Sequence, residues 1–349
     1  MGLFRWNLLP RALLNNDIIF KLVFSEKIRL KILDCTPAGI YEAVAILDQG
    51  GLLGLPTETV YGLAADARNE SALQRIFQTK GRPADHPLIV HIGNPEELGQ
   101  WVQDVPPLAE DLIQNFWPGP LTLILPARSD VSRWVTGGQS KVAVRCPALE
   151  ATQSVLKTLG RGVCAPSANR FGRISPTTAQ HVLADLGTSI EAILDAGPCR
   201  FGLESTIVDL SVEPAVILRP GALAVEQIAQ ISGYMPQILK RAQNTRTSGL
   251  LDKHYAPRKP VQLCSTSQLQ DPDLLSSAVY SEAVILSIVR PACPGLWLEM
   301  PVEADQYAQQ LYDALRQADA SDKPLIVIES PPQQPQWLAI HDRIERASR

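Results

Sequence analysis

The runs LTLILP at residues 121–126 and VAVRCP at residues 142–147 decide the fold class of this chain. Each is short, apolar, rich in β-branched residues and bounded by Gly or Pro, which is typical of a buried strand. The same pattern recurs in PLIVHI, GVCAP, AILDAG, STIVDL and AVILRPG, and helical periodicity fills the stretches between, for example at 38–49. We therefore expect an α/β (α+β) domain with one large twisted mixed sheet and flanking helices.

This domain is expected to span residues 38–232. A linker rich in Pro, Gly, Ser, Thr and Asn follows at 233–259. In residues 260–349 the strand candidates EAVILSI, GLWLEMP and PLIVIES alternate with helical stretches, which predicts a small C-terminal α/β, Rossmann-like domain. A length of 349 residues fits two domains. Residues 1–37 are interpreted as an N-terminal basic extension, because they lack the uninterrupted apolar core of a secretory signal.

Composition excludes several classes of protein. Hydrophobic residues make up 45% of the chain and charged residues 19%, which is unlike a disordered chain. No apolar run nears the roughly 18 residues that a membrane span needs, so no membrane contact is expected. The net charge of −4 argues against bulk attraction to nucleic acid. The six cysteines never form C-x-x-C, so we expect reduced thiols, a cytoplasmic protein and no protein-bound metal.

Common catalytic motifs are missing or misplaced. There is no Walker A sequence, no H-E-x-x-H and no G-x-S-x-G. Residues 160–165 superficially match a dinucleotide-binding fingerprint, but they lead into a strand candidate instead of opening a helix. Familiar hydrolase, zinc-protease and P-loop chemistry is therefore disfavoured.

Hydroxyl-bearing and cationic side chains instead gather at the ends of the strand candidates, where open α/β sheets bind ligands. These side chains are Thr57, Thr59, Tyr61, His91, Arg145, Ser167, Asn169, Ser205, Thr206 and Arg219. Together with Lys80, Arg82 and Lys141 they predict a cationic cleft that suits a polyphosphate nucleotide and a small anionic co-substrate. The residues alone leave the reaction open.

Several of these residues also have an ordinary structural interpretation. Lys80 and Arg82 flank a glycine, as cations near a capped helix C-terminus do. Arg145 would be mostly buried and needs an anionic partner, which is either a ligand or a structural carboxylate such as Glu58 or Asp195. A histidine in an apolar strand, such as His91, is usually a satisfied core residue. The sequence does not choose between these interpretations.

Several blocks, in this order, resemble the YrdC family: LPTETVYGL, KGRPADHPLIVHI, WPGPLT, VAVRCP, APSANRFGRISPT, ESTIVD and LRPG. The linker sequence HYAPRKP and the terminal AIHDRIERA are similar to the long form of that family, which has an appended C-terminal domain. The resemblance covers about residue 38 to the end. It implies a nucleotidyltransferase that joins L-threonine, bicarbonate and ATP into threonylcarbamoyl-AMP and releases pyrophosphate. The product would feed the threonylcarbamoyladenosine modification of tRNA.

The resemblance also implies roles for individual residues. The residues expected around threonine, with Arg145 on its carboxylate, are Thr59, His91, Arg145, Ala165 and Ser205. The residues expected to face ATP are Arg82, His86, Lys141, Ser167, Asn169, Ser175, Arg219 and, as a lid from the linker, Tyr255. Lys80 and Arg82 are expected to be catalytic, with Lys80 where bicarbonate or carbamate charge develops. Mg²⁺ is expected to arrive with ATP, and tRNA threonylcarbamoyl-transferase proteins are the expected downstream partners.

Two other functions stay open, and two positions depart from the family pattern. The related domain of hydrogenase-maturation carbamoyltransferases accompanies zinc-finger cysteine pairs, which this chain lacks. An RNA-binding module is a third interpretation, but the acidic composition favours weak RNA binding at most. Thr247-Ser248-Gly249 stands where the family usually has proline before the glycine, and Lys141 stands where a small hydroxyl residue is common.

Overall fold

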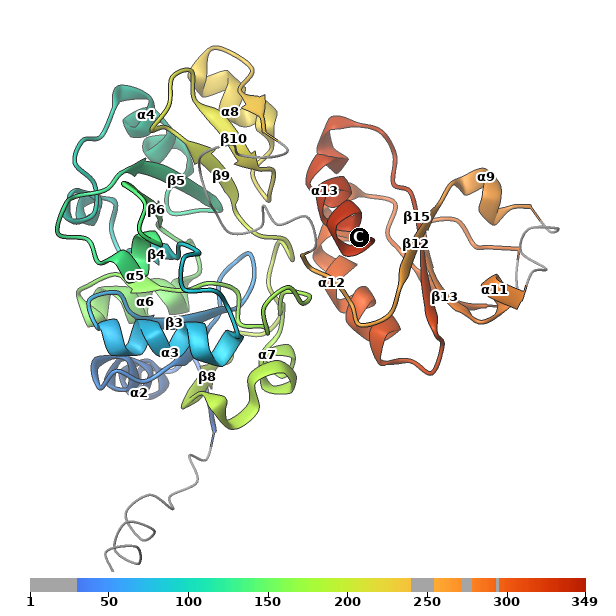
Figure 1. Ribbon diagram of the computed structural model, residues 1–349, viewed down its shortest axis with the longest axis horizontal. Coiled ribbons are helices and arrows are strands. Elements are labelled where there is room, and N and C mark those ends of the chain that lie inside the picture. Colours follow the sequence, from blue (N-terminus) through green and yellow to red (C-terminus); the bar gives the residue numbers. More distant parts are fainter. Residues whose placement is uncertain (1–29, 240–253, 272–277, 293–294) are drawn as a thin grey trace, which may run out of the picture.

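The computed structural model of the protein describes residues 30–239, 254–271, 278–292 and 295–349. Two α/β domains lie side by side, the first drawn in blue to yellow and the second in orange to red (Figure 1). The first domain has an 11-stranded mixed sheet and the second a four-stranded sheet. The fold class predicted from the sequence is therefore confirmed. Thr247-Ser248-Gly249 lies outside the described residues.

The large sheet has the strand order β1-β8-β2-β3-β7-β4-β6-β5-β9-β10-β11. Its strands are β1 (Lys31–Leu33), β2 (Leu53–Leu55), β3 (Gly62–Asp66), β4 (Ile89–His91), β5 (Leu121–Pro126), β6 (Lys141–Arg145), β7 (Val163–Cys164), β8 (Ala192–Leu194), β9 (Thr206–Asp209), β10 (Val216–Arg219) and β11 (Gln237–Ile238). Strand β6 is parallel to β4 and antiparallel to β5. This register places Arg145 beside His91 on one side and beside Thr122 on the other.

Helices cover this sheet and join its strands. They are α2 (Pro37–Asp48), α3 (Glu70–Lys80), α4 (Pro107–Phe116), α5 (Arg133–Thr136), α6 (Glu150–Leu159), α7 (Ala179–Leu186) and α8 (Val225–Ser232), with 3-10 turns η1 (Pro95–Gln100) and η2 (Gly187–Ser189). Helix α3 begins after Asn69, whose side chain accepts the backbone N–H of Ala72 at 3.1 Å. It ends at Gly81, whose φ of 66° is left-handed. This cap turns the backbone between Lys80 and Arg82.

The sheet is longer at both ends than the boundaries 38–232 predicted from the sequence. Strand β1 lies within the expected N-terminal extension and pairs in parallel with β8. Strand β11 lies within the expected linker and pairs with β10. Strands this short carry too few residues for an alternating pattern of apolar and polar residues, so periodicity could not predict them.

The second domain has a parallel sheet of order β12-β15-β13-β14. Its elements are β12 (Val261–Cys264), α9 (Thr266–Leu269), α11 (Ala278–Ser281), β13 (Ala283–Ser287), β14 (Leu296–Glu299), α12 (Ala304–Ala320), β15 (Leu325–Glu329), η3 (Pro335–Trp337) and α13 (Leu338–Ala347). Helices α12 and α13 lie on the side of this sheet that faces the first domain (Figure 1). The predicted strands and helices of this domain are present.

A buried carboxylate fills the crevice at the carboxyl end of the small sheet. Glu329, which ends β15, accepts the backbone N–H groups of Ile288 and Val289 at 2.7 and 3.2 Å. It also accepts the hydroxyl of Thr266 at 2.6 Å. In doubly wound folds this crevice is where anionic ligands bind. Here the chain supplies the anion itself.

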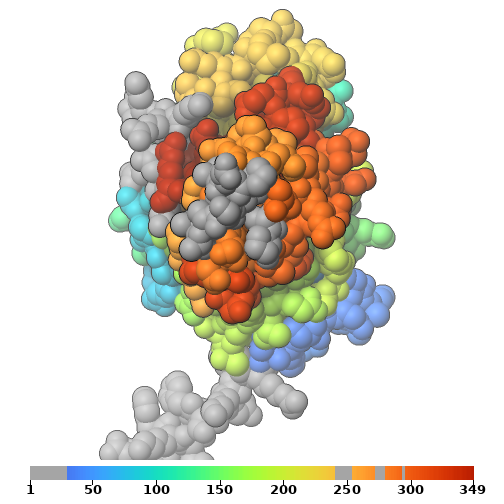
Figure 2. Space-filling model, turned by 90° about the vertical axis from the view of Figure 1, so that its right-hand side faces the viewer, coloured from blue at the N-terminus to red at the C-terminus, as the bar shows by residue number. Residues whose placement is uncertain are grey.

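Helix α12 makes a close contact between the domains. In the space-filling view, the orange and red residues of the second domain lie directly against the green residues of the first (Figure 2). Arg316 of α12 donates to both carboxylate oxygens of Asp185 at 2.6 and 3.1 Å. A Cβ built on Gly202 would lie 2.5 Å from the Cα of Gln309, so the helix backbone rests on this glycine. Within the described ranges, no helix is both long and apolar enough to cross a membrane.

We predict that Gly202→Ala destabilises the protein more than Gly233→Ala does. Both glycines have left-handed φ angles, of 72° and 75°, so both substitutions carry the same backbone penalty. Nothing lies within 4 Å of a Cβ at Gly233, the residue that caps α8. The added methyl at Gly202 meets helix backbone, which should cost about 1–3 kcal/mol more. Urea unfolding of both variants measures the difference, and equal free energies of unfolding would show that α12 does not press on Gly202.

Candidate active site

One pocket collects most of the residues that the sequence singled out. The predicted residues that line it are Thr57, Thr59, Lys80, Arg82, His91, Arg145, Ala165, Ser167, Asn169, Ser205, Arg219 and Tyr255. Ile89 and His91 both line it, and they occupy alternate positions of β4, so they face the same side of the sheet. The pocket therefore extends from the strand ends, where the sequence predicted it, onto one face of the sheet.

Three residues expected to face ATP lie outside this lining. Lys141 begins β6, at the opposite end of the strand from Arg145, and its Nζ pairs with Asp209 at 3.1 Å. The half-buried His86 ring meets the Phe171 ring edge-on at 5.4 Å between centroids. Ser175 is buried and donates to Glu204 at 2.6 Å. The expectation that these three side chains contact ATP remains a prediction.

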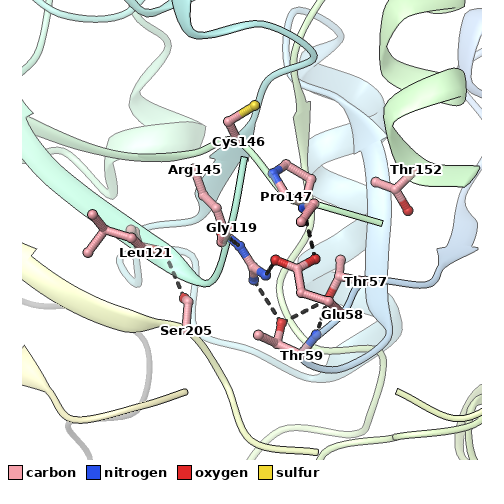
Figure 3. Close-up of polar contacts among 12 residues, drawn as sticks. Thr57, Glu58, Thr59, Gly119, Leu121, Arg145, Cys146, Pro147, Thr152 and Ser205 are labelled. Atoms are coloured by element: carbon pink, nitrogen blue, oxygen red, sulfur yellow. Dashed lines mark hydrogen bonds and ion pairs between the residues drawn. The ribbon is translucent and has the colours of Figure 1, made fainter. Parts of the chain in front are cut away.

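The Arg145 guanidinium is held from three directions (Figure 3). It donates to Glu58 at 2.6 Å, to the Thr59 hydroxyl at 2.8 Å and to the carbonyl of Gly119 at 3.2 Å. Of the two structural partners that the sequence suggested, Glu58 is the one found; the other Glu58 oxygen accepts the backbone N–H of Ala148 at 3.1 Å. Each terminal nitrogen of Arg145 keeps one further N–H that no described residue accepts, so a ligand carboxylate can still bind there.

Hydrogen-bond directions fix the polarity of the pocket opposite Arg145. The Thr57 hydroxyl donates its single O–H to the carbonyl of Val60 at 2.6 Å. The Thr59 hydroxyl must therefore donate its own O–H to Thr57, and towards the pocket it can only accept hydrogen bonds. His91 Nδ1 lies 3.2 Å from the carbonyl of Ile89, so Nδ1 carries the proton and Nε2 the lone pair.

The His91 ring is neutral, because burial and then the nearby Arg145 lower its pKa to about 3. The pocket thus offers donors from Arg145 and acceptors from Thr59 and His91. This arrangement suits a small zwitterion such as an α-amino acid.

Arg219 and Ser205 form a second rigid pair on the pocket wall. Arg219 donates through Nε and Nη2 to the Ser205 carbonyl at 3.1 and 2.9 Å, and through Nη2 to its hydroxyl at 3.1 Å. The neighbouring Gly221 permits this approach, because a Cβ there would lie 2.5 Å from the Ser205 carbonyl carbon. Glycine is therefore required at this position of the LRPG block.

Lys80 and Arg82 are both buried where α3 ends. Lys80 Nζ donates to the carbonyl oxygens of Ser167 and, at 2.7 Å, of Asn169. Arg82 donates to the carbonyl of Pro87 at 2.8 Å, and its guanidinium lies 5.9 Å from the Phe171 ring centroid. Burial lowers the pKa of Arg82 to about 10, so it remains a cation at neutral pH. It is suited to bind an oxyanion such as a phosphate.

Glu204 is a pocket residue that sequence reasoning missed. Its carboxylate accepts from Ser175 at 2.6 Å, from Tyr312 of α12 at 3.0 Å and from Arg343 of α13 at 2.8 Å. Burial would raise its pKa, but Arg343 and Arg219 outweigh burial and lower it to about 2. The second domain thus supplies the counter-ion to a charge in the wall of the pocket.

Tyr255 connects the linker to this ion pair and to the pocket. The Arg343 guanidinium lies 5.0 Å from the centroid of the Tyr255 ring, and the Tyr312 ring stacks on Tyr255 with 5.7 Å between centroids. Tyr255 is only 1% exposed, and its hydroxyl has no hydrogen-bond partner among the described residues. The same is true of His254 Nδ1 and Asn169 Oδ1, which belong to residues that line the pocket. Such buried polar atoms mark where a ligand would complete the hydrogen bonding.

The missed residues left only weak signals in the sequence. Glu204 sits inside the quoted block ESTIVD and directly follows the apolar Leu203. Arg343 lies in AIHDRIERA among other charges that suggest an exposed helix face. Only the three-dimensional contact between the domains reveals that it is fully buried. In the described part of the chain, no group of His, Cys, Asp or Glu is placed to hold a metal ion.

The fold and the pocket define a two-domain α/β protein that binds small anionic molecules between cations on one face of its large sheet. A family model of the Sua5/YciO/YrdC family, described as telomere recombination, matches residues 45–221. A second family model, described as threonylcarbamoyl-AMP synthase, C-terminal domain, matches residues 223–349. The chain belongs to the Sua5/YciO/YrdC family and has its two-domain form, which confirms the family resemblance.

Relatives match the chain over most of its length. A threonylcarbamoyl-AMP synthase of Pyrococcus abyssi is 38% identical over 317 residues, covering 88% of this chain and 93% of that protein. One of Bacillus subtilis is 35% identical, covering 88% and 92%. The crystal structure of P. abyssi Sua5 complexed with L-threonine superposes with a TM-score of 0.85 at 35% identity, covering 91% of this chain and 97% of that one.

We predict that Arg343→Met destabilises the protein by about 3 kcal/mol or more, because it leaves the buried Glu204 without its counter-ion. The double variant with Glu204→Gln should recover part of this loss. Since the pKa of Glu204 is lowered from 4.5 to about 2, the loss is present above pH 4.5 and disappears as the pH falls towards 2.

Urea unfolding at several pH values measures these free energies. Lys31→Met is the control, because it breaks an exposed pair with Glu42 and should cost less than about 1 kcal/mol. Equal losses in Arg343→Met and Lys31→Met would contradict a buried, charge-bearing contact between the domains.

Proposed function

We infer that the chain is an L-threonylcarbamoyladenylate synthase. As a nucleotidyltransferase, it makes threonylcarbamoyl-AMP and pyrophosphate from L-threonine, bicarbonate and ATP, for the threonylcarbamoyladenosine modification of tRNA. The observation that carries this inference is the polarity of the pocket. One buried site combines an Arg145 fork and two acceptors, which suit an amino acid, with the basic residues Lys80, Arg82 and Arg219.

Threonine fits the end of the pocket formed by β4, β6 and the segment before β9. Its carboxylate would take the remaining N–H groups of Arg145, and its ammonium and hydroxyl groups would donate to Thr59 and His91. Ala165 and Ser205 would border this end of the pocket. Because Glu58 and Gly119 fix the guanidinium in advance, little reorganisation accompanies binding.

The triphosphate fits the end of the pocket where α3 ends and β10 ends. Arg82 and Arg219 are buried cations that can stabilise the negative charge that develops at the α-phosphate. Ser167 and Asn169 follow β7 and line the wall between the two ends. The reaction needs no covalent intermediate on the protein: the threonine nitrogen attacks bicarbonate, and the carbamate oxygen then attacks the α-phosphorus and releases pyrophosphate.

The carboxylates of this pocket do not fit a metal ion held by the chain. Glu204 is already shared among Ser175, Tyr312 and Arg343, and Glu58 is paired with Arg145. The Mg²⁺ expected with ATP would therefore be carried by the triphosphate as part of the substrate. The chain contributes cations and positioning.

The position of Tyr255 in the linker supports a role for this segment in excluding water from the pocket. Tyr255 lines the pocket and is held by Arg343 and Tyr312 of the second domain. A closed segment at this position would protect a carbamate and a mixed anhydride from hydrolysis. The product would then pass to a tRNA-modifying transferase, which is the class of reaction that consumes such an activated carbamoyl group.

Threonine-dependent release of pyrophosphate from ATP in the presence of bicarbonate tests the function. The expected result is release that requires all three substrates and produces threonylcarbamoyl-AMP, identified by mass spectrometry. Activity with carbamoyl phosphate but none with threonine and bicarbonate would instead favour a carbamoyltransferase.

We predict that Arg145→Lys raises the KM for threonine on the order of 10- to 100-fold, because one or two charge-assisted hydrogen bonds are lost. The KM for ATP should stay within about two-fold. The variant keeps a cation beside Glu58, so the fold should survive, and thermal unfolding checks this. Equal increases of both KM values would mean that Arg145 serves the structure of the pocket and does not bind threonine.

A further inference from the structure

The surroundings of the Lys80 amine are unusual for a lysine. The residue is 3% exposed and lines the pocket at the end of α3. Its Nζ donates to two backbone carbonyls, those of Ser167 and Asn169. No carboxylate of the described residues pairs with it. Buried lysines are normally paired with an anion, so this one needs another explanation.

The number of hydrogen-bond acceptors matches a neutral amine. An ammonium group has three N–H donors and no lone pair. A neutral amine has two N–H groups and one lone pair. The carbonyls of Ser167 and Asn169 accept two N–H groups, which leaves one position on Nζ. In the neutral form that position is a lone pair, whereas in the charged form it is a buried N–H without a protein partner.

The surrounding charges favour the neutral form as well. The charged and titratable groups near Lys80, from its own turn, the 165–173 loop, α7, the linker and the segment before β9, are Arg82, Arg170, Asp185, His254 and Glu204. Burial and then the cation of Arg82 lower the pKa of Lys80 well below its usual value, and the carboxylate of Asp185 only partly opposes them.

We propose that Lys80 enters the reaction as a neutral amine and accepts the proton of the threonine ammonium, an inference that rests on the proposed synthase function. Threonine must lose this proton before its nitrogen can attack. The proton moves from the threonine nitrogen to Nζ of Lys80, which becomes an ammonium. The free amine then forms a bond to the bicarbonate carbon, and one C–O bond of bicarbonate breaks as water leaves, giving the carbamate anion.

The same proton transfer places a positive charge where it is next needed. Lys80 is therefore already a cation when the neutral amine and bicarbonate combine into the anionic carbamate. The carbamate oxygen then attacks the α-phosphorus, and the bond to the pyrophosphate oxygen breaks. Lys80 thus serves as base first and as counter-charge second, whereas Arg82 is a cation throughout.

The pocket geometry supports contact between Lys80 and the threonine nitrogen. The carbonyl of Ser167 that holds Nζ belongs to the segment directly after β7. Strand β7 pairs with β4, which carries His91, a residue proposed to accept from threonine. Lys80, His91 and Arg145 line one continuous pocket. A threonine bound by its carboxylate on Arg145 would hold its nitrogen between the His91 and Lys80 sides.

The pH dependence of the activity distinguishes a Lys80 that acts as a base from a Lys80 that is always charged. If Lys80 is the base, kcat/KM for threonine rises as the pH rises through its pKa. If it acts only as a cation, activity falls over the same range. Free threonine also loses its ammonium proton as the pH rises, so the acid limb of the profile must be assigned to residue 80 by a change made at residue 80.

Three forms of the full chain make this assignment: the wild type, Lys80→Arg and Lys80→Cys alkylated to S-aminoethylcysteine. The last restores an amine that is intrinsically more acidic than that of lysine. Arginine keeps the charge but has no lone pair to accept a proton. We expect Lys80→Arg to lower kcat on the order of 10²- to 10⁴-fold. The aminoethylated variant should regain activity, with the acid limb of kcat/KM for threonine moved to lower pH.

Wild type carried through the same alkylation controls for modification of native cysteines, and circular dichroism with thermal unfolding checks that each form is folded. Lys80→Arg activity within a few-fold of wild type would overturn the proposal. So would an acid limb that stays at the same pH in the aminoethylated variant, or a folded aminoethylated variant without restored activity. Wild type that releases no pyrophosphate with threonine would overturn the proposed function instead.

Discussion

The need of each buried charge for a partner inside the protein is the constraint on which this structure depends. The site needs cations to hold anionic substrates, and a protein interior tolerates each of them only beside a carboxylate or carbonyl oxygens. Glu204 is the most consequential of these partners. Its ion-pair partner, Arg343, belongs to α13 of the second domain. The second domain is therefore part of the electrostatics of the pocket, and the Arg343–Tyr255 stack brings the linker into the same arrangement.

The direction of each hydrogen bond determines what the pocket can bind. The Val60 carbonyl accepts a hydrogen bond from Thr57, so Thr59 donates to Thr57 and is left as an acceptor towards the pocket. The Ile89 carbonyl accepts a hydrogen bond from His91 Nδ1, which leaves His91 Nε2 as an acceptor. Backbone groups that bind no substrate thus decide which end of an amino acid goes where. Arg145, held by Glu58, supplies the complementary donors. In the proposed binding mode, the fold of β4 and of the segment before β3 would set the orientation of the substrate.

The sequence predicted the regular elements well and the charged contacts poorly. Long amphipathic helices such as α12 and Gly- or Pro-bounded strands such as β5 have a local pattern, and the structure confirms them. Strands β1, β3, β11 and β12 were missed. The positions of β1 and β11 depend on pairing with β8 and β10.

Most candidate site residues meet in one pocket, since strand order brings their elements together. The partners Glu204 and Arg343 are far apart in the sequence, and neither shows its burial locally.

The small sheet has a different consequence for the whole molecule. Glu329 occupies the position of a bound anion with a carboxylate that is covalently part of the domain. A domain that binds a free metabolite there gains stability by mass action, and so varies with metabolite concentration. This domain carries its own anion at fixed stoichiometry. The anion that holds the backbone N–H groups of Ile288 and Val289 is thus part of the same domain that carries Arg343.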